Sequence, residues 1–261
     1  MKINLTGKTA LVGGSSGGIG KAVAEQLAES GASVTLMSHS GNKLKSIVAG
    51  LSTDQGQVHN YLVVDFSDFE GYKVLISDFF ATNSVDILVN NTQGPDAGNT
   101  LDKQVPDYQE AFDLLFKTVV FTTELALKHM IKNKWGRIIN AASVSVKEPL
   151  SYLALSNTIR AAVVTWAKSL ASDVGEHNIT VNSILTGYFD TDRINQLNTK
   201  KAEQQGIPQE EVRSDMESKV PLKRIGDPKE YGYLVTYLAS EQAAFITGTQ
   251  IPIDGGLLKS L

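Results

Sequence analysis

The chain has 261 residues and a net charge of −4, with 42% hydrophobic and 20% charged residues. This is a globular composition, and its acidic balance argues against nucleic acid or an anionic membrane as a main partner. The absence of cysteine excludes disulfides, thiolate metal sites and cysteine nucleophiles, and we expect no bound metal. Because no apolar stretch approaches the ~20 residues that span a bilayer and no signal-peptide pattern is seen, we expect a cytoplasmic protein.

Strand and helix patterns alternate along the sequence. Apolar runs predict seven strands, at residues 9–14, 33–37, 58–66, 86–90, 137–143, 179–185 and 248–254. Apolar side chains at helical spacing predict helices at 21–30, 43–51, 107–132, 156–174 and 227–240. Strands separated by helices indicate βαβ units, and therefore an α/β fold with a mostly parallel sheet of seven strands and helices on both faces.

Two of the helices carry start signals. Asp227, Pro228 and Glu230 stand at the N-cap, N1 and N3 positions of the last helix. After Pro106, Asp107 and Glu110 have the spacing of a capping box, which predicts that a helix starts there.

Residues 188–222 form the one irregular insertion, and they are polar and charged. The insertion interrupts the alternation near the expected ligand end of the sheet, so we interpret it as a mobile helical lid, with a disordered loop as the alternative. No linker or repeat divides the chain, and we expect residues 1–261 to form a single domain.

The first strand leads through GGSSGGIG (13–20) into a helix. In a nucleotide-binding turn, Gly14 permits the tight bend, Gly18 lets the backbone approach a pyrophosphate, and Gly20 lets the helix pack against the sheet. The helix N-terminus offers free N–H groups to phosphates, and Ser15 and Ser16 can add hydroxyl donors. The alternative is a plain flexible loop, but the strand–turn–helix context favours a nucleotide site.

The spacing G-x-x-x-G-x-G resembles that of the short-chain dehydrogenase/reductase family. The resemblance covers nearly the whole chain and continues through Asp65, NNTQG (90–94), WGRIINAASVS (135–145), residues 161–187 and ITGTQIPIDGG (246–256). It is strongest for the branch of 3-oxoacyl-ACP-reductase-like proteins. It implies a Rossmann-type, doubly wound fold with a nicotinamide dinucleotide held by Gly14, Ser16, Gly18, Ile19, Gly20, Ser38, His39, Asp65, Phe66, Asn91, Thr92, Arg160, Gly187 and Thr191.

The segment after the second strand bears on which cofactor is used. Enzymes that prefer NAD place an acidic residue here, on the ribose hydroxyls. This chain has Ser38, followed by His39 and, further on, Lys43. A 2′-phosphate is tolerated by these side chains, whereas it would be repelled by an aspartate. We therefore favour NADP(H) over NAD(H), although histidine is a weak, pH-dependent cation.

The resemblance also implies a catalytic tetrad of Asn, Ser, Tyr and Lys, and here the chain departs from the pattern. Ser143 matches the serine that orients the carbonyl. Thirteen residues further on, where the tyrosine is expected, stands Ser156, and the lysine position holds Arg160. The asparagine falls near Leu115 or Phe116. The tetrad is thus degenerate, because arginine stays charged and serine is a much poorer acid than tyrosine.

An alternative register makes Tyr152 the proton donor. Tyr152 lies four residues before Ser156, so both would share a face if the helix began one turn early, and Pro149 makes such a start feasible. We therefore count Ser143, Tyr152, Ser156 and Arg160 as the candidate catalytic residues, with packing of Tyr152 against the lid or a second subunit as the alternative.

Two functions remain open at this stage. The first is an NADP(H)-dependent oxidoreductase that reduces a ketone, such as a 3-oxoacyl-ACP or another small carbonyl compound. The second is a nucleotide-binding pseudoenzyme or redox sensor without turnover. The apolar side chains of 107–132 and 156–174 exceed what one core-facing stripe needs, and in this family those helices pack on a second subunit, which predicts a dimer or a homotetramer.

Overall fold

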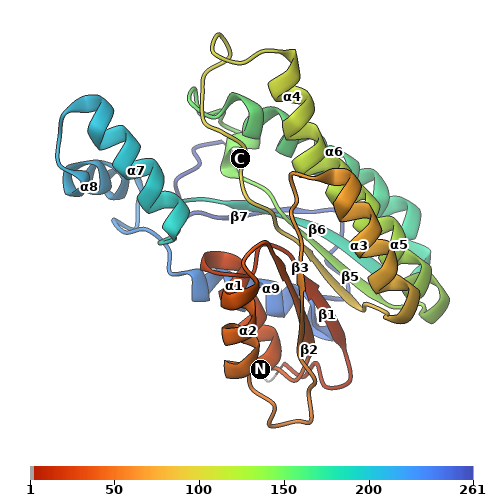
Figure 1. Ribbon diagram of the computed structural model, residues 1–261. Coiled ribbons are helices and arrows are strands. Elements are labelled where there is room, and N and C mark those ends of the chain that lie inside the picture. The colour runs from red at the N-terminus through yellow and green to blue at the C-terminus, as the bar shows by residue number, and fades with distance from the viewer. Residues whose placement is uncertain (1–2, 261) are drawn as a thin grey trace.

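The computed structural model describes residues 3–260, and the strands of this part form one sheet (Figure 1). The sheet has seven strands in the order β3-β2-β1-β4-β5-β6-β7, and every neighbouring pair is parallel. The strands are β1 (Thr9–Val12), β2 (Ser33–Ser38), β3 (Asn60–Val63), β4 (Ile87–Asn90), β5 (Gly136–Ala141), β6 (Ile179–Thr186) and β7 (Gln250–Ile253). The predicted fold class is confirmed. The strand order reverses between β1 and β4, where ligands of such sheets bind.

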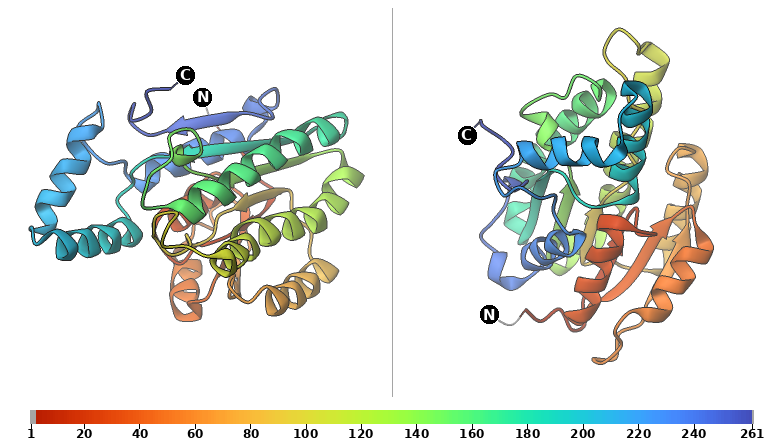
Figure 2. Two further views of the ribbon diagram at one scale, coloured as in Figure 1. Left: turned by 90° about the horizontal axis from the view of Figure 1, so that it is seen from above. Right: turned by 90° about the vertical axis from the view of Figure 1, so that its left-hand side faces the viewer.

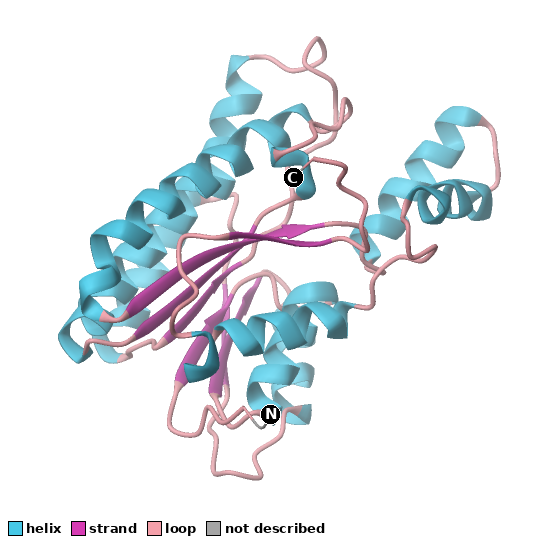
Figure 3. Cartoon of the chain, turned by 180° about the vertical axis from the view of Figure 1, so that it is seen from behind, coloured by secondary structure: helices cyan, strands magenta, loops and turns pink. Residues whose placement is uncertain are grey.

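Helices cover both faces of the sheet (Figures 2 and 3). They are α1 (Gly18–Glu29), α2 (Gly41–Gly50), α3 (Phe69–Thr82), α4 (Val105–Phe112), α5 (Thr118–Asn133), α6 (Ala154–Val174), α7 (Asp192–Gln205), α8 (Gln209–Lys219) and α9 (Pro228–Leu238). One buried cluster joins the sheet to α1, α2 and α9, and a second joins it to α3, α4, α5 and α6. Helix α3, whose buried side chains include Tyr72 and Ile76, was not predicted from the sequence.

The start of α4 differs from the prediction. Its N-cap is Gln104, and the Asp107 carboxylate accepts a hydrogen bond of 2.7 Å from the Gln104 backbone N–H. Asp107 is therefore the N3 residue of the capping box and not its first residue. The reason is Pro106, which lacks an N–H and is tolerated inside the first helical turn, so the helix begins before it.

Many of the apolar side chains that suggested a second subunit are buried within the chain itself. A π-helical turn at Asp113–Lys117 joins α4 to α5 and turns Leu114 and Leu115 into the core. On α6, Ile159, Val163 and Val164 are buried as well. The side chains that stay partly buried include Leu170 and three neighbouring rings, those of Phe112, Phe116 and Trp166. None of the helices described between residues 3 and 260 has the length and hydropathy to cross a membrane.

The predicted start of α9 is confirmed. Asp227 is the N-cap, and its carboxylate accepts from the Lys229 N–H while the Glu230 carboxylate accepts from the Asp227 N–H. Both guanidinium nitrogens of Arg224 also donate to Glu230, each at 2.7 Å. The hydrogen bonds from Arg224 and from the backbone lower the pKa of Glu230 to about 2.

We expect Glu230→Gln to destabilise the protein near neutral pH by at most about 1 kcal/mol, because the ion pair is solvent-exposed. A depressed carboxyl pKa stabilises the folded state above the unfolded value of about 4.3, and this stabilisation is lost as the pH falls toward about 2. Urea unfolding should therefore give a smaller difference in the free energy of unfolding between wild type and variant at pH 3 than at pH 7. Glu203→Gln, an exposed site on α7, is the control; equal differences at both pH values would refute the linkage.

Candidate functional site

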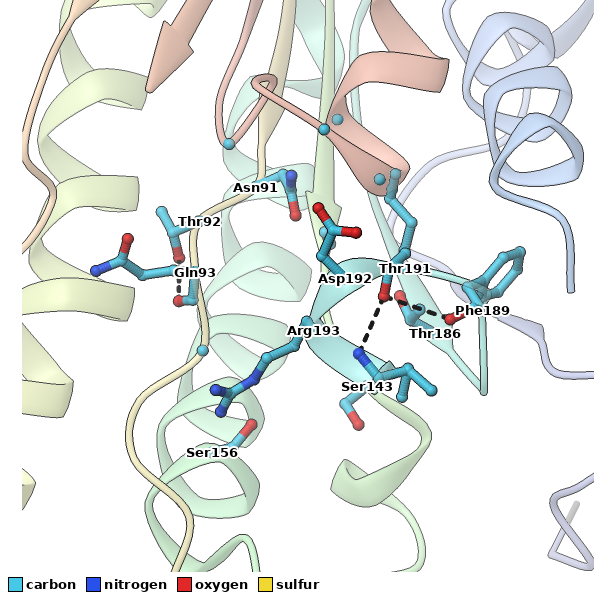
Figure 4. A pocket seen from close by; sticks show the side chains of 18 of the residues that line it. Asn91, Thr92, Gln93, Ser143, Ser156, Thr186, Phe189, Thr191, Asp192 and Arg193 are labelled. Atoms are coloured by element: carbon cyan, nitrogen blue, oxygen red, sulfur yellow. Dashed lines mark hydrogen bonds between the residues drawn. The ribbon is translucent and has the colours of Figure 1, made fainter. Parts of the chain in front are cut away.

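A cavity of about 450 Å³ opens at the carboxyl ends of the strands, at the reversal of strand order (Figure 4). The turn after β1 and the loop after β4 form one side. The ends of β5 and β6, the start of α6 and the first turn of α7 complete it. The cavity therefore lies where the topology of the sheet predicts a ligand.

Three glycines shape the turn between β1 and α1. Gly14 and Gly18 have φ values of +57° and +51°, which side chains disfavour. A Cβ atom at Gly20 would collide with the carbonyl oxygen of Gly14, so the helix approaches the turn as closely as the backbone allows. The side-chain amide of Asn91 donates to the Gly13 carbonyl at 3.0 Å and ties the turn to the loop after β4. The turn is thus a cradle of bare backbone at the N-terminus of α1.

This cradle fits a dinucleotide. The glycines leave the space that side chains would fill, and α1 presents its free N–H groups and its positive dipole end there. Ser16 lines the cavity, and its hydroxyl accepts a 2.8 Å hydrogen bond from Ser38 at the end of β2. The buried Ser38 therefore lies beside the turn, where an acidic residue would face a bound ribose.

The side chains around Ser38 are polar or basic. Lys43 lines the cavity, and His39 is exposed next to Ser38.

The carboxylate of Asp65 accepts hydrogen bonds from Ser67, whose hydroxyl and backbone N–H both donate to it. These bonds, with a smaller contribution from His39, lower the pKa of Asp65. Phe66 is buried and packs on the ring of Tyr72, with centroids 5.4 Å apart.

Ser156 and Arg160, which stand at the expected tyrosine and lysine positions, also line the cavity. Ser156 and Arg160 lie one turn apart on α6, and Nε of Arg160 donates to the Ser156 hydroxyl at 3.2 Å. Another guanidinium nitrogen of Arg160 donates to the Ala141 carbonyl at the end of β5, at 2.5 Å. Burial lowers the pKa of Arg160, and the nearby charge of Arg193 lowers it further. Arg160 is thus a cation fixed between β5 and α6, with Ser156 beside it.

Ser143 lies just beyond β5 on the same cavity wall. Its hydroxyl oxygen accepts from the Ser145 backbone N–H at 3.1 Å, which fixes the side chain at the start of a short 3₁₀ turn. The hydroxyl hydrogen stays available for a bound ligand. Ser143, Ser156 and Arg160 therefore converge on one region of the cavity.

The position where the resemblance places an asparagine is apolar. Leu115 lies in the π-helical turn, and it lines a small gap against Arg160 and Val163. A leucine there supplies no hydrogen bond to a water chain. The buried amides of Asn90 and Asn140 lie on the same small gap, and Asn90 donates to Asn140 at 2.8 Å.

Tyr152 lies outside the residues that line the cavity. Helix α6 begins at Ala154, so Tyr152 belongs to the preceding turn and does not share a helical face with Ser156, contrary to the alternative register. Burial of its hydroxyl, with a smaller contribution from the neighbouring Tyr188, raises the pKa of Tyr152 to about 12. The geometry favours Ser156 over Tyr152 as the group next to a bound carbonyl.

Most of the residues expected at the site line the cavity. They are Gly14, Ser16, Gly18, Ile19, Gly20, Asn91, Thr92, Ser143, Ser156, Arg160, Gly187 and Thr191. Ser38, His39, Asp65, Phe66 and Tyr152 lie outside that lining.

Of the cavity residues in the insertion, only Thr191 was predicted from the sequence, and Asp192 and Arg193 were not. Thr191 caps α7 by accepting from the Ile194 N–H, and this cap places Asp192 and Arg193 in the first turn beside the glycine-rich turn. The signal that could have found them is Thr191 itself, a cap residue followed by charged side chains.

The predicted helical character of the insertion agrees with α7 and α8, which stand out from the layers of the fold (Figure 2). Arg213 on α8 pairs with Asp190 at 2.9 Å and with Glu217 at 3.0 Å. The Asp190 pair ties the far helix to the segment that follows β6.

Comparison with known proteins places the whole chain in a family. The family model described as "Enoyl-(Acyl carrier protein) reductase" matches residues 14–258. The 3-oxoacyl-[acyl-carrier-protein] reductase of Aquifex aeolicus is 32% identical over 98% of this chain and 100% of its own length. The NADPH-dependent reductase BacG of Bacillus subtilis is 30% identical over 97% of this chain and 99% of its own.

A solved structure shares both the fold and the layout. The L-sorbose reductase of Gluconobacter frateurii, complexed with NADPH and L-sorbose, superimposes with a TM-score of 0.92 at 28% identity. The match covers 100% of both chains. The similarity therefore includes the insertion as well as the sheet.

Proposed function

The chain belongs to the short-chain dehydrogenase/reductase family of oxidoreductases, and on that basis we propose that it reduces a carbonyl compound with NADPH. The observation that carries the proposal is the single cavity lined by the glycine cradle, Ser143, Ser156 and Arg160. A nucleotide site alone would not need a fixed cation and two hydroxyl groups at its far end.

The cofactor residues proposed are those of the glycine cradle, together with Asn91, Thr92, Gly187 and Thr191 on the facing walls. Ser38, His39 and Lys43 are proposed to face the 2′-phosphate, and the absence of a carboxylate among these three side chains supports NADP(H) over NAD(H). Asp65 and Phe66 are proposed to flank the adenine. When bound, the dihydronicotinamide supplies a hydride to the carbonyl carbon.

The chain's own groups act on the carbonyl oxygen. Ser143 and Ser156 donate hydrogen bonds to it, and Arg160 stabilises the negative charge that develops there. Because Arg160 does not release its proton, the product oxygen takes a proton through the Ser156 hydroxyl, which recovers one from water in the open cavity. The site is thus built for charge stabilisation more than for acid catalysis.

Two relatives support a carbonyl substrate. One is named for 3-oxoacyl-[acyl-carrier-protein] reduction and the other structure holds L-sorbose, so a 3-oxoacyl thioester or another small ketone is the proposed class. The chain is proposed to form a single domain, in which helices α7 and α8 act as a lid over the cavity. The remaining aromatic surface of α4 and α6 is proposed to join subunits in a dimer or homotetramer.

The proposal is tested by NADPH oxidation with a panel of carbonyl compounds, which includes a 3-oxoacyl thioester, hydroxyketones and oxo acids. We expect carbonyl-dependent oxidation with at least one class. Calorimetry that shows tight NADPH binding, with no oxidation by any compound, would instead favour the pseudoenzyme or redox-sensor function, which the serine at position 156 and the arginine at position 160 motivate.

Cofactor preference has its own test. Ser38→Asp is expected to weaken NADPH binding at least about tenfold, or about 1.4 kcal/mol, because a carboxylate beside Ser16 would repel the 2′-phosphate. Binding of NADH should stay equal or improve. Dissociation constants of both nucleotides, measured by calorimetry, check this, and an unchanged ratio between them would contradict the assignment of Ser38.

A further inference from the structure

The chain has five arginines, and the two at the cavity differ from the other three. Arg137, Arg213 and Arg224 each lie within ion-pair distance of a carboxylate. Arg160 and Arg193 both line the cavity, and neither forms an ion pair with any carboxylate of residues 3–260. Two unpaired guanidinium groups in one cavity leave a positive charge that the protein itself does not neutralise.

The contacts of the two arginines are with neutral oxygens. Arg160 donates to the Ser156 hydroxyl and the Ala141 carbonyl. Arg193 donates one bond of 3.0 Å to the Pro95 carbonyl in the loop after β4. A guanidinium has five N–H donors, so both groups retain donors for a ligand.

The two groups face the same part of the cavity. Figure 4 shows the Arg193 guanidinium, carried by the first turn of α7, directed toward Ser156. Ser156 is the group that accepts from Arg160. The charge of Arg193 also contributes to the lowered pKa of Arg160, as expected of two nearby cations.

The one acidic side chain on this wall does not neutralise the pair. Asp192 lines the cavity, but Figure 4 shows its carboxylate directed to the glycine-rich turn and away from the Arg193 guanidinium. Lys43 also lines the cavity, and we assign it to the 2′-phosphate of the cofactor. The positive charge near Ser156 is therefore available to the substrate.

We propose that the substrate is an oxo acid whose carboxylate binds Arg193 and Arg160 while its carbonyl meets Ser143 and Ser156. A carboxylate matches the planar fork of a guanidinium and accepts two parallel hydrogen bonds from it. Because Arg160 donates to Ser156 and the Arg193 guanidinium is directed toward it, we place the carboxylate of the substrate only a few bonds from its reacting carbonyl. This rests on the proposed carbonyl reduction, and it favours a short free acid over a thioester.

The test measures binding and not turnover, so it is separate from the test of reduction. The protein, saturated with NADP⁺, is titrated in a calorimeter with 2-oxobutanoate and 2-oxobutanamide, and with 4-oxopentanoate and 4-oxopentanamide. At least one acid should bind about tenfold or more tightly than its amide, as charge-assisted hydrogen bonds predict. Equal binding within both pairs would overturn the proposal.

The substitution Arg193→Gln tests whether the preference for the acid over its amide arises in the cavity. It should remove this preference and leave NADP⁺ binding unchanged. Lys200→Gln, an equal loss of charge at an exposed site on the same helix, should keep the preference. Loss of the preference in Lys200→Gln, or its survival in Arg193→Gln, would contradict the proposal. A preserved preference without any NADPH oxidation would overturn carbonyl reduction alone.

Discussion

Arg160→Met is expected to lower kcat/KM for NADPH-dependent reduction by about 10²–10³, the range found when one donor to a developing oxyanion is removed. Methionine fills much of the same space, but it donates neither to Ser156 nor to the Ala141 carbonyl. With an uncharged carbonyl compound the loss should fall mainly on kcat, because the charge on the carbonyl oxygen develops as the hydride arrives. With an oxo acid KM should rise as well, because Arg160 also binds the carboxylate of the substrate. Steady-state kinetics, with circular dichroism to verify folding, check this.

Tyr152→Phe is the matched comparison for Arg160→Met. Tyr152 lies outside the cavity lining, so its hydroxyl contacts no reacting atom and turnover should stay close to that of the wild type. If Tyr152→Phe abolished turnover and Arg160→Met did not, the proton donor would be Tyr152, and the roles given to Ser156 and Arg160 would be wrong.

The double substitution Ser156→Tyr with Arg160→Lys is expected to raise kcat by at least about tenfold, toward the 10²–10⁴ that a positioned general acid contributes. It restores the tyrosine and lysine of the family pattern, one helical turn apart on α6. The lysine would lower the pKa of the new tyrosine, so the pH profile should gain a limb that the wild type lacks.

The single substitution Ser156→Tyr is the control for this gain. Beside Arg160 it adds a phenol without the lysine, and it should gain less than the double variant. A double variant that binds NADPH as the wild type does, yet turns over no faster, would show that the proton transfer does not limit the wild-type reaction.

The sheet and the nucleotide turn could be predicted from the sequence because their signals are local. A strand followed by Gly14, Gly18 and Gly20 specifies the turn by backbone sterics alone, and the structure shows positive φ at the first two. The start of α9 could be predicted as well, because Asp227 and Glu230 form the two halves of its capping box. Such features need no knowledge of distant residues.

Other features depend on contacts between segments far apart in the chain. Arg193 enters the cavity because the cap at Thr191 orients the first turn of α7, and its unpaired state is visible only once every nearby carboxylate is placed. The position of Tyr152 outside the cavity lining depends on the start of α6 at Ala154 and on the neighbouring Tyr188. The π-helical turn that buries Leu115 has no pattern of its own in the sequence.

The central claim is that the cavity passes a hydride from NADPH to a carbonyl carbon despite the serine and arginine at positions 156 and 160. The most direct measurement uses NADPH carrying deuterium at both C4 positions of the dihydronicotinamide, with a carbonyl compound that supports oxidation, and weighs the alcohol product by mass spectrometry. We expect an alcohol with one deuterium, on the former carbonyl carbon. The yield of this alcohol should fall in Arg160→Met. An alcohol without deuterium, or no alcohol from any carbonyl compound, would contradict it.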